Sequence, residues 1–301
     1  LEANTTANAN CAFGRLSLNG NTTGENNIAV GFESLLSNTT ADKNTAVGMQ
    51  SLRLNTTGNS NAAFGYTSLR DNTTASDNTG FGYLTLQSNS TGNSNVAVGA
   101  AALADNTTAS DNTAIGRKAL RVNTTGANNT AIGQSALSSV TTGNKNIGVG
   151  NQAGNTITTG GNNMCLGENA QPSSATVSNE IVLGNSNNGT LRCQTQTISS
   201  LSDKRDKTNI IDIEDGLDLI NLLKPRKFTW AMREPSANDG KTELGFIAQE
   251  LDEVLGNKND YIHAVSHSNP DKLEASYGRF IPILVKAIQE LSAKVTALEA
   301  G

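Results

Sequence analysis

Residues 38–54 read NTTADKNTAVGMQSLRL, and residues 55–71 repeat the pattern as NTTGNSNAAFGYTSLRD. A glycine marks the same place in each of eleven such units, 17 residues apart. These glycines are Gly14, Gly31, Gly48, Gly65, Gly82, Gly99, Gly116, Gly133, Gly150, Gly167 and Gly184. A fixed period of this length is typical of repeat proteins, in which equivalent residues stack on one another.

Other columns of the unit keep the phase of the glycine. The preceding residue is apolar from Phe13 to Leu183, and an asparagine stands four residues before the glycine from Asn10 to Asn163. A leucine stands four residues after it from Leu18 to Leu137. The Asn-x-Ala-Val piece alternates as a half-buried strand does, and Asn-Thr-Thr has turn chemistry. The pattern predicts an all-β shaft of stacked units, a β-solenoid or β-helix very roughly 50 Å long.

The core of a single unit is expected to be small. About three apolar side chains per unit are expected to face inward, and one is often alanine. At about 25 cal/mol per Å², such a core would barely offset the entropy of ordering the unit. Burial between chains would solve this, so we expect a trimer or another intertwined oligomer, built either from three solenoids side by side or from one interwound helix.

The asparagine and threonine columns are interpreted as structural ladders that satisfy backbone groups. The Asn-Thr-Thr pieces also match the N-glycosylation acceptor, as at Asn4, Asn21 and Asn38. Their recurrence in phase with the repeat favours turn chemistry as the origin of the match. An exposed Asn, Thr and Ser surface suited to glycan contact is the functional alternative.

Charge divides the chain into two parts. Residues 1–201 hold 9 Lys/Arg and 10 Asp/Glu, whereas residues 202–301 hold 13 and 17. We therefore expect a repeat shaft over residues 1–194, a polar linker over 195–201 and a separate domain over 202–301. The net charge of −5 is spread thinly, so neither nucleic acid nor an anionic membrane is an expected partner.

Cysteine usage and hydropathy exclude further classes. Cys11, Cys165 and Cys193 share no metal-ligand spacing, so they are interpreted as small apolar fillers, and no metal or cofactor is expected. No stretch approaches the length of a membrane span, and the N-terminus lacks the layout of a signal peptide. The chain begins at Leu1 inside a repeat, which suggests that an upstream portion is missing.

The last hundred residues carry four sequence blocks in a fixed order. They are Ser-Asp-x-x-x-Lys from Ser202, Lys-Pro-x-x-Phe-x-Trp from Lys224, Gly-Phe-Ile-Ala-Gln-Glu from Gly245 and Ile-Pro-Ile-Leu-Val-Lys-Ala-Ile-Gln-Glu-Leu from Ile281. A helix is expected from Gly216 to Leu223, closed by Pro225. The second and third blocks are interpreted as a strand, a loop and a strand that enters a second helix.

These blocks resemble the intramolecular chaperone auto-processing domain of phage endosialidases and related tailspikes. The repeats resemble those of trimeric phage fibres and, less closely, the head repeats of trimeric autotransporter adhesins. The chaperone resemblance implies an α+β domain that assembles a homotrimer, helps the upstream β-structure to fold and is then released by cleavage before the motif serine. It places the scissile bond between Leu201 and Ser202.

The same resemblance implies that Ser202 is the nucleophile and Lys207 its general base. A serine hydroxyl needs a base to remove its proton, and a lysine acts as one only in a desolvated pocket. Asp203 is a candidate for orienting the backbone or the lysine. In the alternative interpretation, Ser202 and Asp203 only cap a turn and Lys207 is a solvated charge. Ser199 and Ser200 are rejected because neither stands five residues before a lysine with aspartate following.

The C-terminal segment has apolar residues alternately three and four apart, as in a coiled-coil seam. They are Ile281, Leu284, Ile288, Leu291, Val295 and Leu298. We expect them to trimerise the domain, although the seam chemistry is also common in dimers and the trimer is implied by the family. An ordinary amphipathic helix is the alternative. His263 and His267, four apart in a strand-like stretch, are interpreted as ordinary surface or strand histidines rather than as a metal pair.

The sequence therefore predicts a trimeric viral, phage-type tail fibre or appendage protein. Its only enzymatic activity would be a single self-cleavage by a serine endopeptidase. It would be made in the host cytoplasm and carried on the virion, with other tail proteins and a host-surface glycan or protein receptor as partners. A cell-surface trimeric adhesin is the second hypothesis, and it would require an upstream signal peptide and a downstream anchor, which is not seen before Gly301. The third is a fragment of a polysaccharide-degrading tailspike, for which the shaft offers only scattered acids such as Glu25, Glu33 and Glu168.

Overall fold

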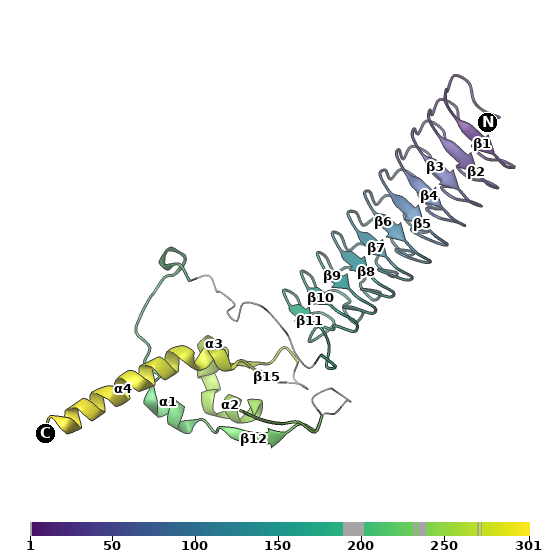
Figure 1. Cartoon of the computed structure of the whole chain (residues 1–301). Coiled ribbons are helices and arrows are strands. Elements are labelled where there is room, and N and C mark those ends of the chain that lie inside the picture. Colours follow the sequence, from purple (N-terminus) through teal and green to yellow (C-terminus); the bar gives the residue numbers. More distant parts are fainter. Residues whose placement is uncertain (1, 189–201, 232, 234–238, 270, 272) are drawn as a thin grey trace. The chain divides into compact units, whose positions relative to one another are not determined.

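The computed structural model describes residues 2–188, 202–231, 233, 239–269, 271 and 273–301. The chain forms two compact units, Leu1–Asn185 and Ser186–Gly301, which are drawn in Figure 1. The first is a parallel β-solenoid and the second is a small α+β unit that ends in a helix, so the expected fold class is confirmed. The expected linker over residues 195–201 lies outside the described residues.

One three-residue strand per unit builds the solenoid. The strands are β1 (Cys11–Phe13), β2 (Ile28–Val30), β3 (Thr45–Val47), β4 (Ala62–Phe64), β5 (Thr79–Phe81), β6 (Val96–Val98), β7 (Thr113–Ile115), β8 (Thr130–Ile132), β9 (Ile147–Val149), β10 (Met164–Leu166) and β11 (Ile181–Leu183). They form a single parallel sheet in chain order. Each residue pairs with its equivalent one turn later, as Ala46 does with Ala63. Neighbours in the sheet belong to the same chain, so the shaft is a single-chain solenoid rather than an interwound helix.

The glycine column turns the chain out of each strand. Gly99 has φ +117°, and a Cβ added there would lie 2.8 Å from the carbonyl carbon of Gly116 in the next turn. A side chain would therefore meet the neighbouring backbone as well as adopt a conformation that L-residues avoid. This double restriction explains why the column never changes.

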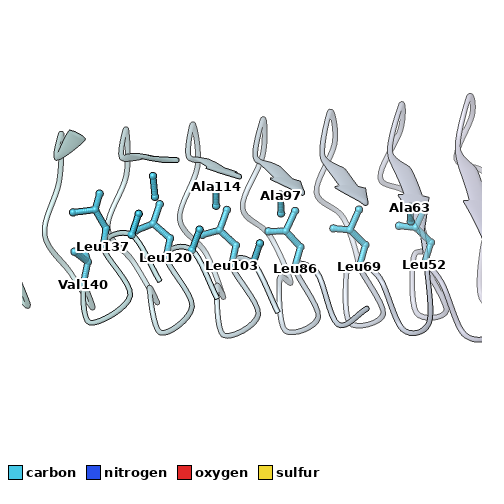
Figure 2. Packing of buried hydrophobic residues seen from close by; sticks show 14 of the residues in the cluster. Leu52, Ala63, Leu69, Leu86, Ala97, Leu103, Ala114, Leu120, Leu137 and Val140 are labelled. Carbon is cyan, nitrogen blue, oxygen red and sulfur yellow. The ribbon is translucent and has the colours of Figure 1, made fainter. Parts of the chain in front are cut away.

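The leucine column is buried at a second left-handed position. Leu103 has φ +50° and is fully buried. The conformation costs about 1–2 kcal/mol, whereas burying a leucine side chain contributes about 1.5–3 kcal/mol. Core packing therefore outweighs the strain, and Figure 2 shows Leu52 to Leu137 stacked turn upon turn beside the strand alanines.

Buried asparagines form two ladders along the shaft. Nδ2 of Asn38 donates to Oδ1 of Asn21 at 2.8 Å and to the carbonyl of Ala41 at 3.0 Å. In the second ladder the backbone N–H of Asn44 donates to Oδ1 of Asn27 at 2.9 Å. Asn21, Asn27, Asn38 and Asn44 are fully buried. The structural interpretation of these columns is confirmed, and burial makes Asn21 and Asn38 poor glycosylation acceptors.

The apolar column before the glycine faces outward, and this corrects the expected inward direction. In β2 the middle residue Ala29 is buried, whereas Ile28 is 42% exposed and Val30 is half-buried. Successive residues of a strand point to opposite faces, so Ala29 and Val30 cannot both face the core. The inward partner of Ala29 is Asn27, whose polar groups are satisfied by the ladder.

The single chain encloses its own core, which corrects the premise that one chain is too thinly filled. The cluster of leucines and alanines from Leu18 to Ala170 is fully buried without a second chain. The amide ladders fill the remaining interior and supply hydrogen bonds. Any case for an oligomer therefore rests on the outside of the shaft rather than on its interior.

The cysteines differ from one another. Cys165 occupies the middle of β10 in the core, as expected of a filler, and burial raises the pKa of its thiol to about 11. Cys11 is exposed at the start of β1, so the filler interpretation is wrong there. Cys193 lies outside the described residues.

The described part of the C-terminal unit contains several short helices, the longer helix α4 and two small antiparallel sheets. Its elements are η1 (Lys204–Asp206), α1 (Leu217–Leu222), β12 (Arg226–Thr229), β13 (Thr242–Gly245), α2 (Ala248–Leu255), η2 (Gly256–Lys258), α3 (Asn259–Ile262), β14 (Val265–Ser266), β15 (Glu274–Ala275), η3 (Tyr277–Phe280) and α4 (Ile281–Glu299). β12 pairs with β13, and β14 with β15. The core gathers around Leu219, Leu251, Leu255, Phe280 and Ile283. The helix expected before Pro225 and the strand, loop, strand and helix that follow are present.

Candidate functional site

A tight turn at the start of the C-terminal unit brings Ser202 and Lys207 together. The carboxylate of Asp203 accepts a hydrogen bond from the backbone N–H of Arg205 at 2.9 Å and so caps η1. The chain turns once, and the N–H of Lys207 donates to the carbonyl of Lys204 at 3.2 Å. This turn carries the side chain of Lys207 back toward Ser202.

The two proposed catalytic groups are in hydrogen-bond contact. Nζ of Lys207 lies 2.5 Å from Oγ of Ser202. A neutral lysine at this distance could accept the hydroxyl proton, which is the geometry a Ser-Lys dyad requires. Leu201, the other side of the expected scissile bond, lies outside the described residues.

Both residues are exposed in the single chain. A Ser-Lys dyad requires an enclosed pocket, and the single chain does not enclose this turn, so the contact alone does not make a base. The geometry supplies proximity, and the desolvation that the chemistry needs must come from something that covers this turn.

Asp203 orients the backbone rather than the lysine. Its carboxylate also accepts from Nη2 of Arg205 at 2.6 Å. The hydrogen bonds from the Arg205 side chain and backbone hold the pKa of Asp203 below its ordinary value. The contacts of Asp203 therefore favour the role of orienting the backbone of the turn over that of orienting Lys207.

The expected trimerisation residues lie along α4 on an exposed face. Ile281, Ile288 and Leu298 are 61%, 66% and 81% exposed, and Leu284, Leu291 and Val295 are exposed as well. A different face of α4 packs on its own unit through buried Ile283 and Ala287. One face of α4 therefore packs against its own unit, and the face with the predicted seam is not buried by any of the described residues.

Two anchoring contacts in this unit had no signal in the sequence. Glu290 of α4 accepts a hydrogen bond from the backbone N–H of Leu217 at 2.8 Å and so caps α1. The carboxylate of Asp215 accepts hydrogen bonds from Lys258 and Tyr261. The partners are more than forty residues apart in the chain, so no local motif could have indicated them.

The two histidines have different surroundings. His263 ends α3 in a left-handed conformation, and Nε2 of His267 lies 3.0 Å from the carboxylate of Asp252. Within the described ranges, no three His, Cys, Asp or Glu side chains cluster as metal ligands. No helix of the described chain is both long and apolar enough to cross a membrane.

Comparison with protein families found a match over part of the C-terminal unit. Residues 202–259 match the peptidase family S74, described as the chaperone of endosialidase, and the match begins at Ser202. A curated relative is the uncharacterized protein VP1 of Micromonas pusilla reovirus (isolate Netherlands/2005), which is 48% identical over 60 residues. That alignment covers 19% of this chain and 3% of the relative's length. No solved structure matches the chain.

The fold and the site thus define a repetitive β-solenoid shaft followed by a small α+β unit with a serine and a lysine in contact at its start. That C-terminal unit carries a chaperone-of-endosialidase domain, which confirms the resemblance seen in its sequence blocks over residues 202–259. The block that begins at Ile281 lies beyond the matched range, so its assignment to the same family stays a prediction.

Proposed function

We propose that this chain is one protomer of a trimeric viral, phage-type tail fibre or appendage. Its C-terminal unit brings three chains together, helps the shafts to fold in register, cuts the bond before Ser202 and leaves. The contact between Lys207 and Ser202 at the first residue of the matched chaperone domain carries this proposal. The stacked shaft and the viral relative support the appendage role.

The repetition of the shaft gives the chaperone a task. The eleven turns are nearly equivalent, so shafts of different chains could pack side by side one turn out of phase at little cost in energy. The exposed seam of α4 offers a contact that is not repeated along the chain. A C-terminal clamp of this kind sets one common starting point for three shafts.

The proposed cleavage is an attack by Ser202 on the carbonyl carbon that precedes it. Neutral Lys207 takes the proton of the Ser202 hydroxyl, Oγ bonds to the Leu201 carbonyl carbon, and the peptide C–N bond breaks as the proton passes to the departing Ser202 amine. Water then opens the ester, giving the Leu201 carboxylate and restoring the hydroxyl. The chain is consumed in one turnover and acts on no external substrate.

The exposure of the dyad in one chain supports an order of events. Because Lys207 needs a dry surrounding to act as a base, cleavage is expected only after other protomers cover the turn. Assembly would then precede release, and a chain that has not found its partners would keep its chaperone.

Intact mass measurement of the expressed chain tests the proposal. We expect two fragments, residues 1–201 and 202–301, with Ser202 as the new N-terminus. Ser202→Ala should leave an uncut, folded trimer, whereas the matched control Ser200→Ala should be cut as the wild type is. A folded wild-type trimer that stays whole, or a Ser202→Ala chain that is still cut at the same bond, would overturn the assignment.

The two other hypotheses gain no specific support. Glycoside hydrolysis needs two carboxylates about 5–10 Å apart. Glu33 is instead paired with Arg53 at 2.7 Å, and the hydrogen bond from Arg53 lowers its pKa. The proposed fibre is compatible with a shaft that binds a receptor and with one that acts only as a spacer. A glycan array on the released shaft would distinguish these two roles.

A further inference from the structure

An apolar surface runs along the solenoid on the outer face of its sheet. We call it the outer stripe and define it as the first and third residues of each strand from β1 to β11, whose side chains point away from the core. The third residue is Val, Ile, Leu or Phe in every turn. The stripe is therefore continuous, because parallel pairing in register places each member directly beside its equivalent in the next turn.

The stripe is exposed or half-buried along its length and carries no charge. Phe81, Ile115 and Ile132 are 57%, 39% and 40% exposed. Its first positions are apolar residues, alanine or threonine, and no Asp, Glu, Lys or Arg occurs at either position of any strand. Charged residues such as Asp42 and Lys43 stand in the turns between the strands instead.

The dimensions of the stripe exceed those of scattered surface residues. Strands of three residues span ~10 Å and eleven layers span ~50 Å, which gives an area on the order of 500 Å². The largest apolar patch of an ordinary monomer is about 300–600 Å² and is often functional. A standard interface buries about 800 Å² per partner, so the stripe is small for two chains that meet by diffusion alone. It suits chains that another element has already brought together.

We propose that the outer stripe is the surface through which the shafts of three copies of this chain pack side by side, parallel and in register. The inference rests on the proposed function for the number of copies and for the clamp that starts assembly. It assigns the lateral contact to a face of the shaft itself, outside the matched chaperone domain.

The absence of charge favours a second copy of this chain as the occupant. When three identical parallel chains meet around a threefold axis at equal height, each turn of one stripe faces the same turn of its neighbours, so a charge near the axis would meet like charges. A stripe without charge over its whole length avoids this repulsion in every turn. A partner of different sequence would impose no such restriction.

Two neighbouring turns supply a mark for the register. Phe64 and Phe81 lie 5.5 Å apart, and next to them Tyr66 and Tyr83 are stacked at 5.5 Å. These tyrosines stand just past the glycines that follow the two phenylalanines, so the aromatic residues gather at one height of the shaft. Copies in register would place this aromatic zone against its equivalents, whereas a shift of one turn would misalign it.

A paired charge substitution tests the inference in the full chain. Ile115→Asp with Val149→Asp places two charges on the outer stripe two turns apart, and both side chains are exposed in the single chain. The control, Thr125→Asp with Thr159→Asp, has the same spacing on exposed turns outside the sheet. We expect both variants to be cut before Ser202, and native mass measurement to find the released shaft trimeric in the wild type and the control but monomeric in the stripe variant.

The outcomes separate this inference from the proposed function. A stripe variant that stays trimeric overturns the inference, as does a monomeric wild-type shaft beside a C-terminal fragment that trimerised and cut normally. A monomeric wild-type shaft, together with loss of glycan binding in the stripe variant, would assign the stripe to receptor binding instead. Failure of cutting and of trimerisation in the wild type would count against the proposed function itself.

Cross-linking gives a second measurement that leaves the apolar surface almost intact. Thr113→Cys lies on the stripe in β7, and Thr125→Cys lies in the turn that follows. Both are made with Cys11→Ser, Cys193→Ser and Cys165→Ala, the last restoring the residue that most other turns have in the core. A short bis-maleimide should link copies at the first position and not at the second, and the reverse result would overturn the inference.

Discussion

Val140 occupies the place in its turn that Asn123 occupies in the preceding one, and among the described residues Asn123 Oδ1 is left buried without a hydrogen-bond partner. From Asn38 to Asn123, each amide of this column donates to the amide oxygen of the preceding turn, as Asn123 Nδ2 does to Asn106 Oδ1 at 3.0 Å. Valine cannot donate, so the ladder ends at this point. The shaft thus tolerates an apolar residue at the end of the ladder at the cost of one unpaired acceptor.

An apolar residue in the middle of this ladder should be more costly. Asn72→Val removes the donor that lies 2.9 Å from Asn55 Oδ1 and the acceptor that lies 3.0 Å from Asn89 Nδ2. Leaving a buried polar group unpaired costs about 1–3 kcal/mol. We expect a clearly lower denaturant midpoint for the shaft, measured by circular dichroism on the released fragment.

The reciprocal change provides the comparison. Val140→Asn would give Asn123 Oδ1 a donor, but its own amide oxygen would face Ile157 in the next turn. The unpaired acceptor moves by one turn rather than disappearing, so the stability should stay within about 1 kcal/mol of the wild type. Equal midpoints for Asn72→Val and the wild type would show that the ladder contributes little.

The repeat sequence predicted the solenoid because its columns must stack, yet it did not predict which apolar column faces the core. The usual rule places apolar residues inward and polar residues outward. Here Asn27 and Ala29 face inward while Ile28 and Val30 face outward, because the asparagine side chain bonds the backbone of the next turn. Hydrogen bonding between turns overrides the hydropathy of a three-residue strand, and a single sequence gives no sign of it.

In the C-terminal unit too, the sequence indicated some features and not others. Ser202 and Lys207 were found through a resemblance to a family, and the capped turn at Asp203 explains how residues five apart come into contact. The contacts of Asp215 with Lys258 and Tyr261 join residues 43 and 46 positions apart. Such contacts depend on the tertiary fold that brings the segment before α1 to η2 and α3, which no local spacing encodes.

Replacing the proposed base while keeping its charge tests what Lys207 does. Arginine stays protonated in proteins, so Lys207→Arg can bond Ser202 but cannot accept its proton. We expect cleavage at least ~100-fold slower, followed by intact mass over time, because general base catalysis contributes about that much or more. Lys204→Arg, in the same turn, should be cut at the wild-type rate. Wild-type cutting by Lys207→Arg would reduce the lysine to a structural contact.

A charge on the seam of α4 should prevent assembly. Leu291 is 50% exposed on the predicted seam, and Ala293 is exposed on another face of the same helix. Burying an unpaired carboxylate costs several kcal/mol, so Leu291→Asp should stay monomeric and uncut, whereas Ala293→Asp should assemble and cut. Native mass measurement in a Ser202→Ala background reports assembly separately from cleavage. Trimers formed by Leu291→Asp would favour the alternative of an ordinary amphipathic helix.

The anchoring of Asp215 predicts a pH-dependent loss of stability in the C-terminal unit. Burial raises the pKa of this carboxyl, but the hydrogen bonds from Lys258 and Tyr261 outweigh it and hold the pKa below its usual value. A depressed pKa in the folded state adds stability that is complete above the unfolded pKa of about 4 and is lost as the pH falls through the folded value. Asp215→Asn should therefore have a free energy of unfolding about 1–2 kcal/mol lower than that of the wild type at pH 5–7. This difference should become smaller below pH ~4.

Trp230, the chain's single tryptophan, lies in this unit and reports its unfolding in the full-length protein by fluorescence. The control is Glu250→Gln, which breaks the more exposed pair with Arg226 and should lower the stability less than Asp215→Asn does. A gap between Asp215→Asn and the wild type that persists unchanged at pH 3 would mean that the lost contacts do not depend on the charge of the carboxylate. Such a result would assign the anchoring to packing of Tyr261 rather than to the ion pair with Lys258.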